Sequence, residues 1–326
     1  MKVGLIDVDG HNFPNLCLMK LSAYHKARGD SVEWYRPLES GRLDRVYMSK
    51  VFSFTPDYPY NVNADEIIKG GSGYRIHLEN GREIYDAEND KDLPPEIEHI
   101  FPDYSIYYGI VDGIEQTAYG FLSRGCPRGC SFCHVACKEG RKAYKVADLD
   151  EFWNGQKNIV LCDPNITAVP ECLDLLDQLI QSGARVEFNQ GLDIRLMTRE
   201  KAEKLKQIKI DKIHFAWDRY QDKEKVLPKL KQFKEIYWGG RGNIVVYVLA
   251  NFDTTIDQDL ERVYTLRDLG YSPFIMLYDK EHARREMRQL QRYVNNRYIF
   301  NSPECRTFED YQNRKEDRDE NQLKLF

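Results

Sequence analysis

Apolar and polar residues alternate along the chain in a way that predicts an α/β protein. A short apolar run at residues 3–8 predicts a strand that leads into a loop, and a segment with helical spacing follows at 16–27. Further apolar runs predict strands at 32–35 and 45–54. This β-α-β order is typical of a small doubly wound unit.

From residue 117 onward, strands and helices alternate regularly. Apolar runs predict six strands, at 118–123, 158–162, 185–189, 212–217, 243–249 and 272–278. Helical spacing predicts helices at 146–153, 170–181, 198–207, 223–234 and 257–269. Such a series of β-α units predicts a parallel, barrel-like sheet. In a barrel, the active site lies at the carboxyl ends of the strands.

The remaining segments are expected to connect or cover these two parts. Residues 74–85 predict a hairpin that turns at Asn80-Gly81, and 86–108 are polar and contain prolines, which is typical of a connector. A mixed-charge run at 309–320 predicts a mobile tail. We therefore expect a truncated Rossmann-like domain at 1–73, a hairpin and connector at 74–116, a barrel at 117–283, and a helical cover with a charged tail at 284–326.

The composition limits the cellular setting and the partners. The 326 residues carry a net charge of −5, which gives no overall attraction to nucleic acid, and 42% are hydrophobic, enough for a substantial core. No apolar run is long enough to cross a bilayer, and the first strand is unlike a signal peptide. We therefore expect a cytoplasmic protein without a membrane partner, whose eight cysteines are reduced thiols and metal ligands.

The chemistry of the chain centres on three closely spaced cysteines. Cys126, Cys130 and Cys133 follow the first strand of the expected barrel with the spacing Cys-x-x-x-Cys-x-x-Cys. Three thiolates on one short loop suit an iron–sulfur cluster, and a ligand set of three leaves one iron open to bind and activate another molecule. A zinc knuckle completed by His134 or Cys137 is the alternative, but such a knuckle does not explain the strand and helix array that follows.

The segment 124–133, which reads Arg-Gly-Cys-Pro-x-x-Cys-x-Phe-Cys, resembles the cluster motif of the radical S-adenosylmethionine (SAM) superfamily. The resemblance implies a partial (β/α)6 barrel and a [4Fe–4S] cluster held by Cys126, Cys130 and Cys133, whose fourth iron chelates SAM. It also implies reductive cleavage of SAM to methionine and a 5′-deoxyadenosyl radical, with Phe132 near the adenine. An electron donor such as a flavodoxin or ferredoxin, and anaerobic conditions, are expected with this chemistry.

The N-terminal part resembles, more loosely, the cobalamin-binding-type domain that precedes the barrel in one branch of that superfamily. Residues 14–33 and 64–71 carry this resemblance. The sequence lacks the Asp-x-His-x-x-Gly motif that would supply an axial histidine, and it is too short for the usual helix and strand before residue 64. We therefore expect a shortened relic without cobalamin. Asp7, Asp9 and His11 could form a metal site there, but a strand-end loop satisfied by its own hydrogen bonds is favoured.

The ends of the later barrel strands carry candidate SAM contacts. The superfamily often has a Gly-Gly-Glu motif that holds the SAM amino group; this sequence lacks it, and Asp163 is the candidate replacement. A turn-opening Asp before Pro is the alternative for Asp163. Gln190 and Asp193 are candidates for the SAM ribose or carboxylate, although Asp193 and Arg195 could instead pair with each other. Asn251 is a candidate in the adenine-contacting segment.

Two further features leave alternatives open. Cys162 could donate a hydrogen atom or trap a substrate at the barrel mouth, but a small buried apolar role is favoured for it and for Cys305. Cys137 has no companion cysteine motif that would form a second cluster.

The segment 280–297 holds six Lys or Arg against two acids. It could bind an anionic partner such as RNA or a phosphorylated substrate, whereas a solvated face over an apolar stripe is the favoured interpretation.

The sequence thus predicts a radical SAM enzyme that modifies an unidentified small molecule, peptide or nucleic-acid base. The overall acidic balance slightly disfavours RNA. Two hypotheses compete with this one. A cobalamin-dependent radical SAM methyltransferase would also hold cobalamin, and a non-catalytic iron–sulfur or zinc protein would bind a partner without cleaving SAM. The metal content and the bound chromophore distinguish the three.

Overall fold

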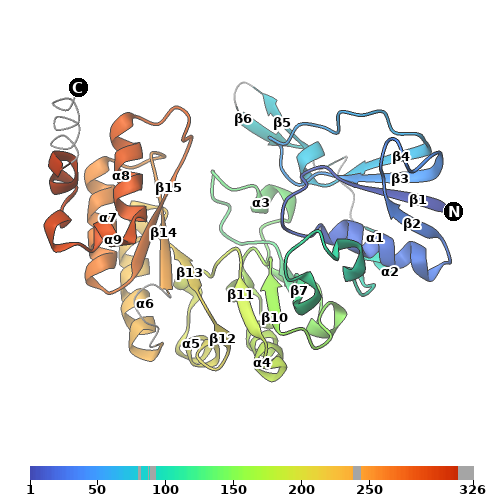
Figure 1. Cartoon of the computed structure of the whole chain (residues 1–326). Helices are drawn as coiled ribbons and strands as arrows, with labels where there is room; N and C mark the ends of the chain where they lie inside the picture. Colours follow the sequence, from blue (N-terminus) through green and yellow to red (C-terminus); the bar gives the residue numbers. More distant parts are fainter. Residues whose placement is uncertain (80–81, 87, 89–92, 238–243, 315–326) are drawn as a thin grey trace. The chain divides into compact units, whose positions relative to one another are not determined.

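The computed structural model describes residues 1–79, 82–86, 88, 93–237 and 244–314. The chain divides into two compact units, Met1–Val186 and Glu187–Phe326. Both combine helices with parallel sheets, so the predicted α/β class is confirmed at this level (Figure 1). The division at residues 73, 116 and 283 stays a prediction. No helix within the described ranges is both long and apolar enough to span a membrane.

The first unit opens with a four-stranded parallel sheet, drawn in blue tones in Figure 1. Its strand order is β2-β1-β3-β4, so β2 and β4 are its edges. The bounds are β1 (Lys2–Asp7), β2 (Ser31–Trp34), β3 (Leu43–Ser49) and β4 (Ala64–Gly70). The strand predicted at 45–54 ends early because the Asp9 carboxylate accepts hydrogen bonds from the N–H groups of Val51 and Phe52 and draws them into a loop.

One helix, α1 (Leu16–Ala27), links β1 to β2 and has the predicted bounds. The Asn15 side chain starts the helix because it accepts a hydrogen bond from the N–H of Leu18 in the first turn. The buried side of α1 packs against Val3 and Leu5 of β1. The other face of the sheet is closed by a second cluster around Ile6. Two apolar clusters, one on each face, therefore hold this sheet in place.

The predicted hairpin forms from β5 (Ile76–Glu79) and β6 (Arg82–Tyr85), which pair antiparallel; its turn at 80–81 lies outside the described residues. The segment 86–108, predicted as a connector, also packs within the first unit. It contains α2 (Pro95–Glu98), and Ile97, Tyr104 and Tyr107 are buried within the first unit. This segment therefore contributes side chains to the core of the first unit.

A second sheet carries the cysteine loop; its strand order is β7-β10-β11-β12, where β12 is Lys209–Ile210. β7 (Thr117–Gly120) pairs with β10 (Asn158–Leu161), and the chain continues through α4 (Cys172–Ser182) to β11 (Arg185–Phe188), the next strand of the sheet. Between β7 and β10 lie β8 (Ser123–Arg124), α3 (Val135–Lys138) and β9 (Tyr144–Lys145).

The helix predicted at 146–153 is wrong, because only a 3-10 turn at Leu149–Glu151 forms. Asp148 and Glu151 cap this turn reciprocally, and the chain then turns so that the Phe152 ring covers Gly120. A Cβ at Gly120 would lie 2.5 Å from that ring.

The second unit is built on the parallel sheet β13-β14-β15. Its strands are β13 (Ile213–Ala216), β14 (Ile244–Ala250) and β15 (Ser272–Leu277). Its helices are α5 (Arg199–Leu205), α6 (Lys223–Ile236), α7 (Ile256–Asp268), α8 (Arg285–Asn295) and α9 (Arg297–Phe300).

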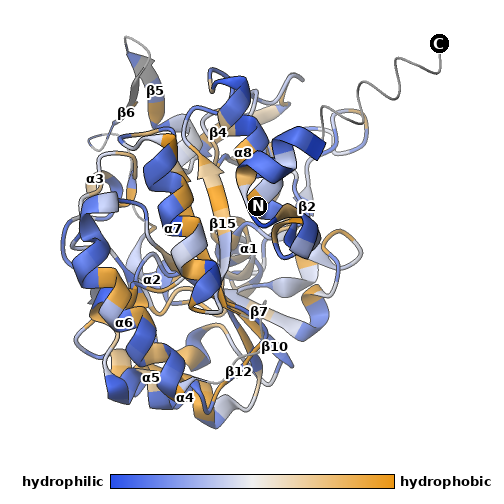
Figure 2. Cartoon of the chain, turned by 90° about the vertical axis from the view of Figure 1, so that its left-hand side faces the viewer, coloured by the Kyte–Doolittle hydropathy of each residue, from blue (hydrophilic) through white to orange (hydrophobic). Residues whose placement is uncertain are grey.

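One face of this sheet is covered by helices. α7 packs on β14 and β15, and α8 packs on β15. Figure 2 shows a mainly hydrophobic β15 and mainly hydrophilic outer surfaces on α7 and α8. The residues at 308–314 are helical, and the rest of the expected tail, from residue 315, lies outside the described residues.

The six strands expected for a barrel are thus present. β7, β10 and β11 lie in one sheet and β13, β14 and β15 in another, and the described residues form no closed barrel sheet. The coarser statement, a mixed α/β protein with parallel sheets, holds. The partial (β/α)6 barrel stays a prediction.

Candidate metal centre

The three cysteines share one loop, which runs from β8 to β9. These two strands pair antiparallel, with Ser123 opposite Lys145, so the two ends of the loop lie side by side. The N–H of Cys126 donates to the carbonyl of Gly140 at 3.2 Å, which extends this closure by one more bond. Cys126 and Cys130 are half buried, and Cys133 is exposed. The sulfur-bearing segment is therefore a closed loop whose side chains remain accessible.

The glycines of the motif are required by the path of this loop. Gly125 and Gly129 have φ values of 76° and 56°, which lie in the left-handed region that glycine adopts at low cost. A Cβ at Gly125 would lie 2.1 Å from the carbonyl oxygen of Lys142. The two arms of the loop approach so closely there that only glycine fits. Within the loop, the N–H of Cys133 donates to the carbonyl of Cys130 at 3.0 Å, which places these two residues on one turn.

Glu139 fixes the start of the loop. Its carboxylate, which is mostly buried, accepts a 2.9 Å hydrogen bond from the N–H of Gly125 and a 2.8 Å bond from the Arg124 guanidinium. The Arg124 guanidinium also lies over the Phe121 ring. Charge-assisted bonds of this kind are among the stronger ones in proteins. Sequence reasoning missed Glu139 because the residue lies outside the cysteine motif.

Asn165 lies against one of the sulfur atoms. Its side-chain amide, 4% exposed, donates to the Sγ of Cys126 at 3.4 Å. The Thr167 hydroxyl donates to the amide oxygen of Asn165 at 2.6 Å, so the amide group is held with its N–H groups toward the sulfur. Asn165 was not among the predicted site residues. The only available signal was its position three residues after a strand end.

Asp163 holds the backbone that leads into the loop. Its carboxylate is 3% exposed and accepts hydrogen bonds from the N–H groups of Leu122, at 3.1 Å, and Ser123, at 2.6 Å, and from the Ser123 hydroxyl. Burial raises the pKa of Asp163 to about 6. The geometry supports a structural role for this carboxylate, and a contact with the SAM amino group stays a prediction.

The other cysteine-loop candidates lie nearby. Phe132 is half buried on the loop, and Cys137 is exposed on α3 with its Sγ 3.0 Å from the carbonyl of His134. Among the described residues, no three His, Cys, Asp or Glu side chains lie close enough together to hold a metal ion. The donor set nevertheless fits an iron–sulfur cluster in its chemistry, because three accessible sulfur atoms share one closed loop.

Cys162 and Cys305 are both buried. This agrees with the small apolar role favoured for them.

In the second unit, Asp193 and Arg195 pair with each other. The Asp193 carboxylate accepts from the N–H and the Nε of Arg195, and Arg195 also forms an ion pair with Asp222. This is the structural alternative foreseen for the two residues. Gln190 is exposed on the turn after β11, where Gly191 has a φ of 81°. Of this group, Gln190 is the side chain that the described structure leaves most accessible.

Asn251 ties two strand ends of the second unit together. Its amide donates to the carbonyl of Tyr278 at 2.9 Å, which links the end of β14 to the residue after β15. The backbone of Asn251 has a φ of 65°, a conformation that Asn tolerates better than most residues. Positive φ values in non-glycine residues are concentrated at functional sites. The position of Asn251 in the turn after β14 is sufficient to explain its positive φ.

A buried ion pair supports the same strand ends. Arg262 and Asp259 are both 0% exposed and bonded to each other. The Arg262 guanidinium also donates to the carbonyls of Trp217, Asp218 and Leu249, which end β13 and β14. The neighbouring Asp218 has its pKa raised to about 6 by burial. The charged groups at these strand ends are therefore largely engaged by the fold.

A cavity of about 250 Å³ lies at the carboxyl end of β1 in the first unit. Asp7, His11, Trp34 and Tyr107 are among its lining residues. Asp7 accepts a 2.6 Å hydrogen bond from the Tyr107 hydroxyl, and burial raises the pKa of Asp7. Asp9 accepts bonds from the loop after β3. These bonds support the satisfied strand-end loop over a metal site formed by Asp7, Asp9 and His11.

Comparison with known proteins adds no family to this picture. No protein-family model matches the chain, and no curated protein matches it.

Proposed function

We propose that the protein is a radical SAM enzyme, in which Cys126, Cys130 and Cys133 hold a [4Fe–4S] cluster. The observation that carries the proposal is the closed, glycine-dependent loop that presents three sulfur atoms directly after β7 and β8. Strands β7, β10, β11, β13, β14 and β15, in chain order, would form the partial (β/α)6 barrel. The cytoplasm and an electron donor such as a flavodoxin or ferredoxin belong to the same proposal.

The chain's own residues would have distinct tasks around the cluster. When bound, such a cluster supplies the electron that cleaves SAM to methionine and a 5′-deoxyadenosyl radical. Glu139 and Asp163 fix the backbone before Cys126, and Asn165 orients the Cys126 sulfur. Phe132 would face the adenine. These residues set the position and the electronic surroundings of the thiolates.

The three residues of the second unit that are candidates for SAM contacts differ in how far their side chains are already engaged. Gln190 is exposed and can donate and accept hydrogen bonds to a ribose or carboxylate. Asp193 is already bonded to Arg195, so it would hold the loop for Gln190 more than bind SAM directly. Asn251 would shape the adenine side through its bond to Tyr278.

The proposal is tested with protein that is purified and reconstituted with iron and sulfide under anaerobic conditions. After reduction and addition of SAM, mass spectrometry should detect 5′-deoxyadenosine. C126A, C130A and C133A should each abolish it together with the visible absorption of the cluster. C137A is the matched control, because Cys137 is an exposed cysteine of the same loop outside the three-cysteine motif, and it should keep both signals.

Three results would contradict the proposal or replace it. A single zinc per chain in anaerobically isolated protein would favour the non-catalytic metal-binding hypothesis. A cobalamin chromophore would favour the methyltransferase. A full, reducible cluster that cleaves no SAM under any condition would leave an iron–sulfur protein without radical chemistry.

A further inference from the structure

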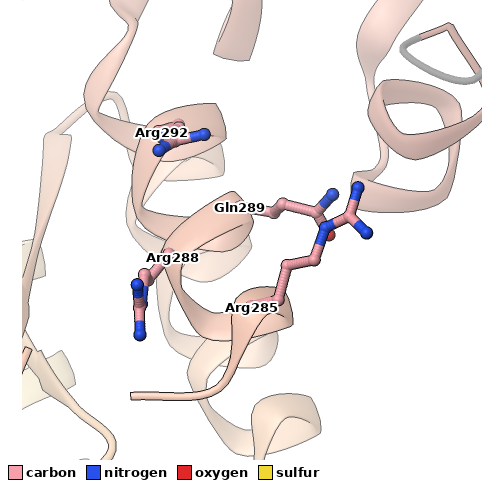
Figure 3. Close-up of a pocket in the computed structure, with 4 residues that line it drawn as sticks. All are labelled: Arg285, Arg288, Gln289 and Arg292. Carbon is pink, nitrogen blue, oxygen red and sulfur yellow. The ribbon is translucent and has the colours of Figure 1, made fainter. Parts of the chain in front are cut away.

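The basic helix α8 carries a row of arginines that the described part of the chain leaves without carboxylate partners. Arg285, Arg288 and Arg292 are exposed and, together with Gln289, line a hollow of about 390 Å³ (Figure 3). Arg284 and Arg297 flank them. Among the described residues, no carboxylate lies within 4.0 Å of any of these five guanidinium groups.

Other arginines of the second unit do have carboxylate partners. Arg195, Arg199 and Arg262 each form an ion pair with at least one carboxylate. On α8, Glu286 lies beside the arginines in sequence, yet it forms no ion pair with them. A solvated face that served only solubility would be expected to mix both signs along its length. The row on α8 presents one sign.

Helix α8 is held in place by its buried side, so the backbone that carries the arginines has a fixed position. Met287, Leu290, Tyr293 and Val294 are buried on the opposite side of α8. The Arg288 guanidinium is also oriented, because its Nε donates to the carbonyl of Ala283 at 2.9 Å and its Nη2 to that of Glu281 at 3.1 Å. Three of its five N–H groups remain for another acceptor. An oriented guanidinium loses less entropy when it binds an anion.

The arrangement suits an extended polyanion better than a single phosphate. Arg285 and Arg292 are two helical turns apart, about 10 Å along the axis, with Arg288 between them. Figure 3 shows the three guanidinium groups spread along the helix and pointing apart, without convergence on one point. Successive phosphates of one strand could each meet a different guanidinium. Gln289 between them can both donate and accept, which fits sugar or base edges.

An exposed aromatic ring continues this surface in sequence. Tyr298, in α9 directly after Arg297, is 92% exposed. Surfaces that bind single-stranded nucleic acid combine arginines along the backbone path with aromatic rings on which bases stack. We propose that the arginine row of α8, with Gln289, binds the phosphate backbone of single-stranded nucleic acid. The net charge of −5 belongs to the whole chain, and this local surface is basic despite it.

Fluorescence anisotropy of a labelled 20-nucleotide single-stranded RNA tests the proposal with the full chain. The wild-type protein should bind at about 50 mM salt with a Kd in the micromolar range or below, and the binding should weaken steeply with salt. The variant R285Q/R288Q/R292Q should bind at least tenfold more weakly. Its log K against log salt slope should be smaller by about 2, since each lost phosphate contact removes about 0.7.

The control removes the same charge from other exposed places. R36Q/R42Q/R199Q also loses three positive charges, but each of these arginines is paired with a nearby carboxylate. It should bind RNA within about twofold of the wild type. R285K/R288K/R292K keeps the charge of the row and loses its bidentate geometry, so it should fall between the wild type and the Gln variant. Circular dichroism melts verify that all variants fold.

Further arms separate the possible ligands. A DNA strand of the same sequence that binds as well as RNA supports recognition of the phosphate backbone, and a preference for RNA adds contacts to the 2′-hydroxyl. Four results would overturn the proposal: no binding of either strand by the wild type, equal binding by the α8 and control variants, displacement of RNA by tripolyphosphate at equal phosphate concentration, or arginine-dependent binding of phosphatidylserine vesicles only. Because the measurement needs no cluster, its failure would leave the proposed SAM chemistry untouched.

Discussion

The cysteine loop of the first unit and the strand ends of the second unit hold their polar residues in opposite ways. In the loop, the sulfur atoms stay accessible. Glu139 holds the backbone before Cys126, and Asn165 donates a hydrogen bond to the Cys126 sulfur. At the strand ends, Arg262 and Asp259 are fully buried and bonded to each other and to the backbone. The comparison teaches that charge near a strand end does not by itself indicate a ligand site. What matters is which groups the fold leaves accessible.

Removal of Arg262 should produce the largest effect. In R262M, the carboxylate of Asp259 stays buried without its partner, and the carbonyls of Trp217 and Leu249 lose their donor. Breaking a buried ion pair from one side costs about 3–5 kcal/mol. Urea unfolding followed by circular dichroism should show a loss of this size.

R199M is the control for this prediction. Arg199 pairs with Glu203 one helical turn away, and both side chains are exposed. Its removal should cost about 0.5 kcal/mol or less. Similar losses in R199M and R262M would mean that the buried pair does not hold the strand ends, and the contrast between the two regions would fail.

The carboxyl of Asp163 should make the stability of the first unit depend on pH. Burial raises its pKa from 3.8 to about 6, so the folded protein binds this proton more tightly than the unfolded chain does. The contribution is fully present below about pH 4 and is lost as the pH rises through 6. A shift of two units corresponds to roughly 3 kcal/mol.

Unfolding free energies of the wild type and D163N at constant ionic strength, from pH 4 to pH 7, measure this contribution. D163N should be less stable throughout, because an amide cannot accept all three hydrogen bonds, but it should lose less stability as the pH rises. The exposed D150N variant should follow the wild type. Parallel curves for the wild type and D163N would contradict the prediction.

The smallest effect concerns Asn165 and the sulfur of Cys126. In the proposed cluster, a donor to the Cys126 sulfur would stabilise the more negative, reduced state, so N165A should lower the reduction potential. One hydrogen bond of about 1 kcal/mol corresponds to roughly 40 mV for a one-electron couple. A redox titration followed by electron paramagnetic resonance measures the potential. The exposed N154A variant is the control, and equal potentials in both variants would remove Asn165 from the site.

Local signals predicted much of the fold. The helix at 16–27 was placed with its observed bounds by its helical spacing, and the structure shows that the adjacent Asn15 caps its start. The strand predicted at 45–54 and the helix at 146–153 failed for a different reason. Asp9 draws the end of the former into a loop, and Phe152 packs onto Gly120 in the latter. Contacts between residues distant in sequence override local propensity in both places.

The candidate site could likewise be predicted only where the information is local in sequence. The spacing of the cysteines and glycines placed three candidate ligands on one loop, because all of that information lies within ten residues of sequence. Asn165 could not be found in this way, since its contact with Cys126 spans 39 residues. For Asp193, sequence reasoning offered a ligand role and a pair with Arg195, and the hydrogen bonds observed are those of the pair. For Asp163 the alternative was a turn before Pro164, whereas its observed bonds go to Leu122 and Ser123, which no local signal predicted.

The edge strand β4 has a feature that matters for aggregation between copies of the chain. Ile67 and Ile68 are exposed in the middle of this strand, which has one neighbour among the described strands. An apolar strand with an open edge can recruit a second chain and start aggregation. Asp65, Glu66 and Lys69 flank the pair and form salt bridges to neighbouring segments. The charges that hold β4 in register thus also act as gatekeepers against cross-chain pairing.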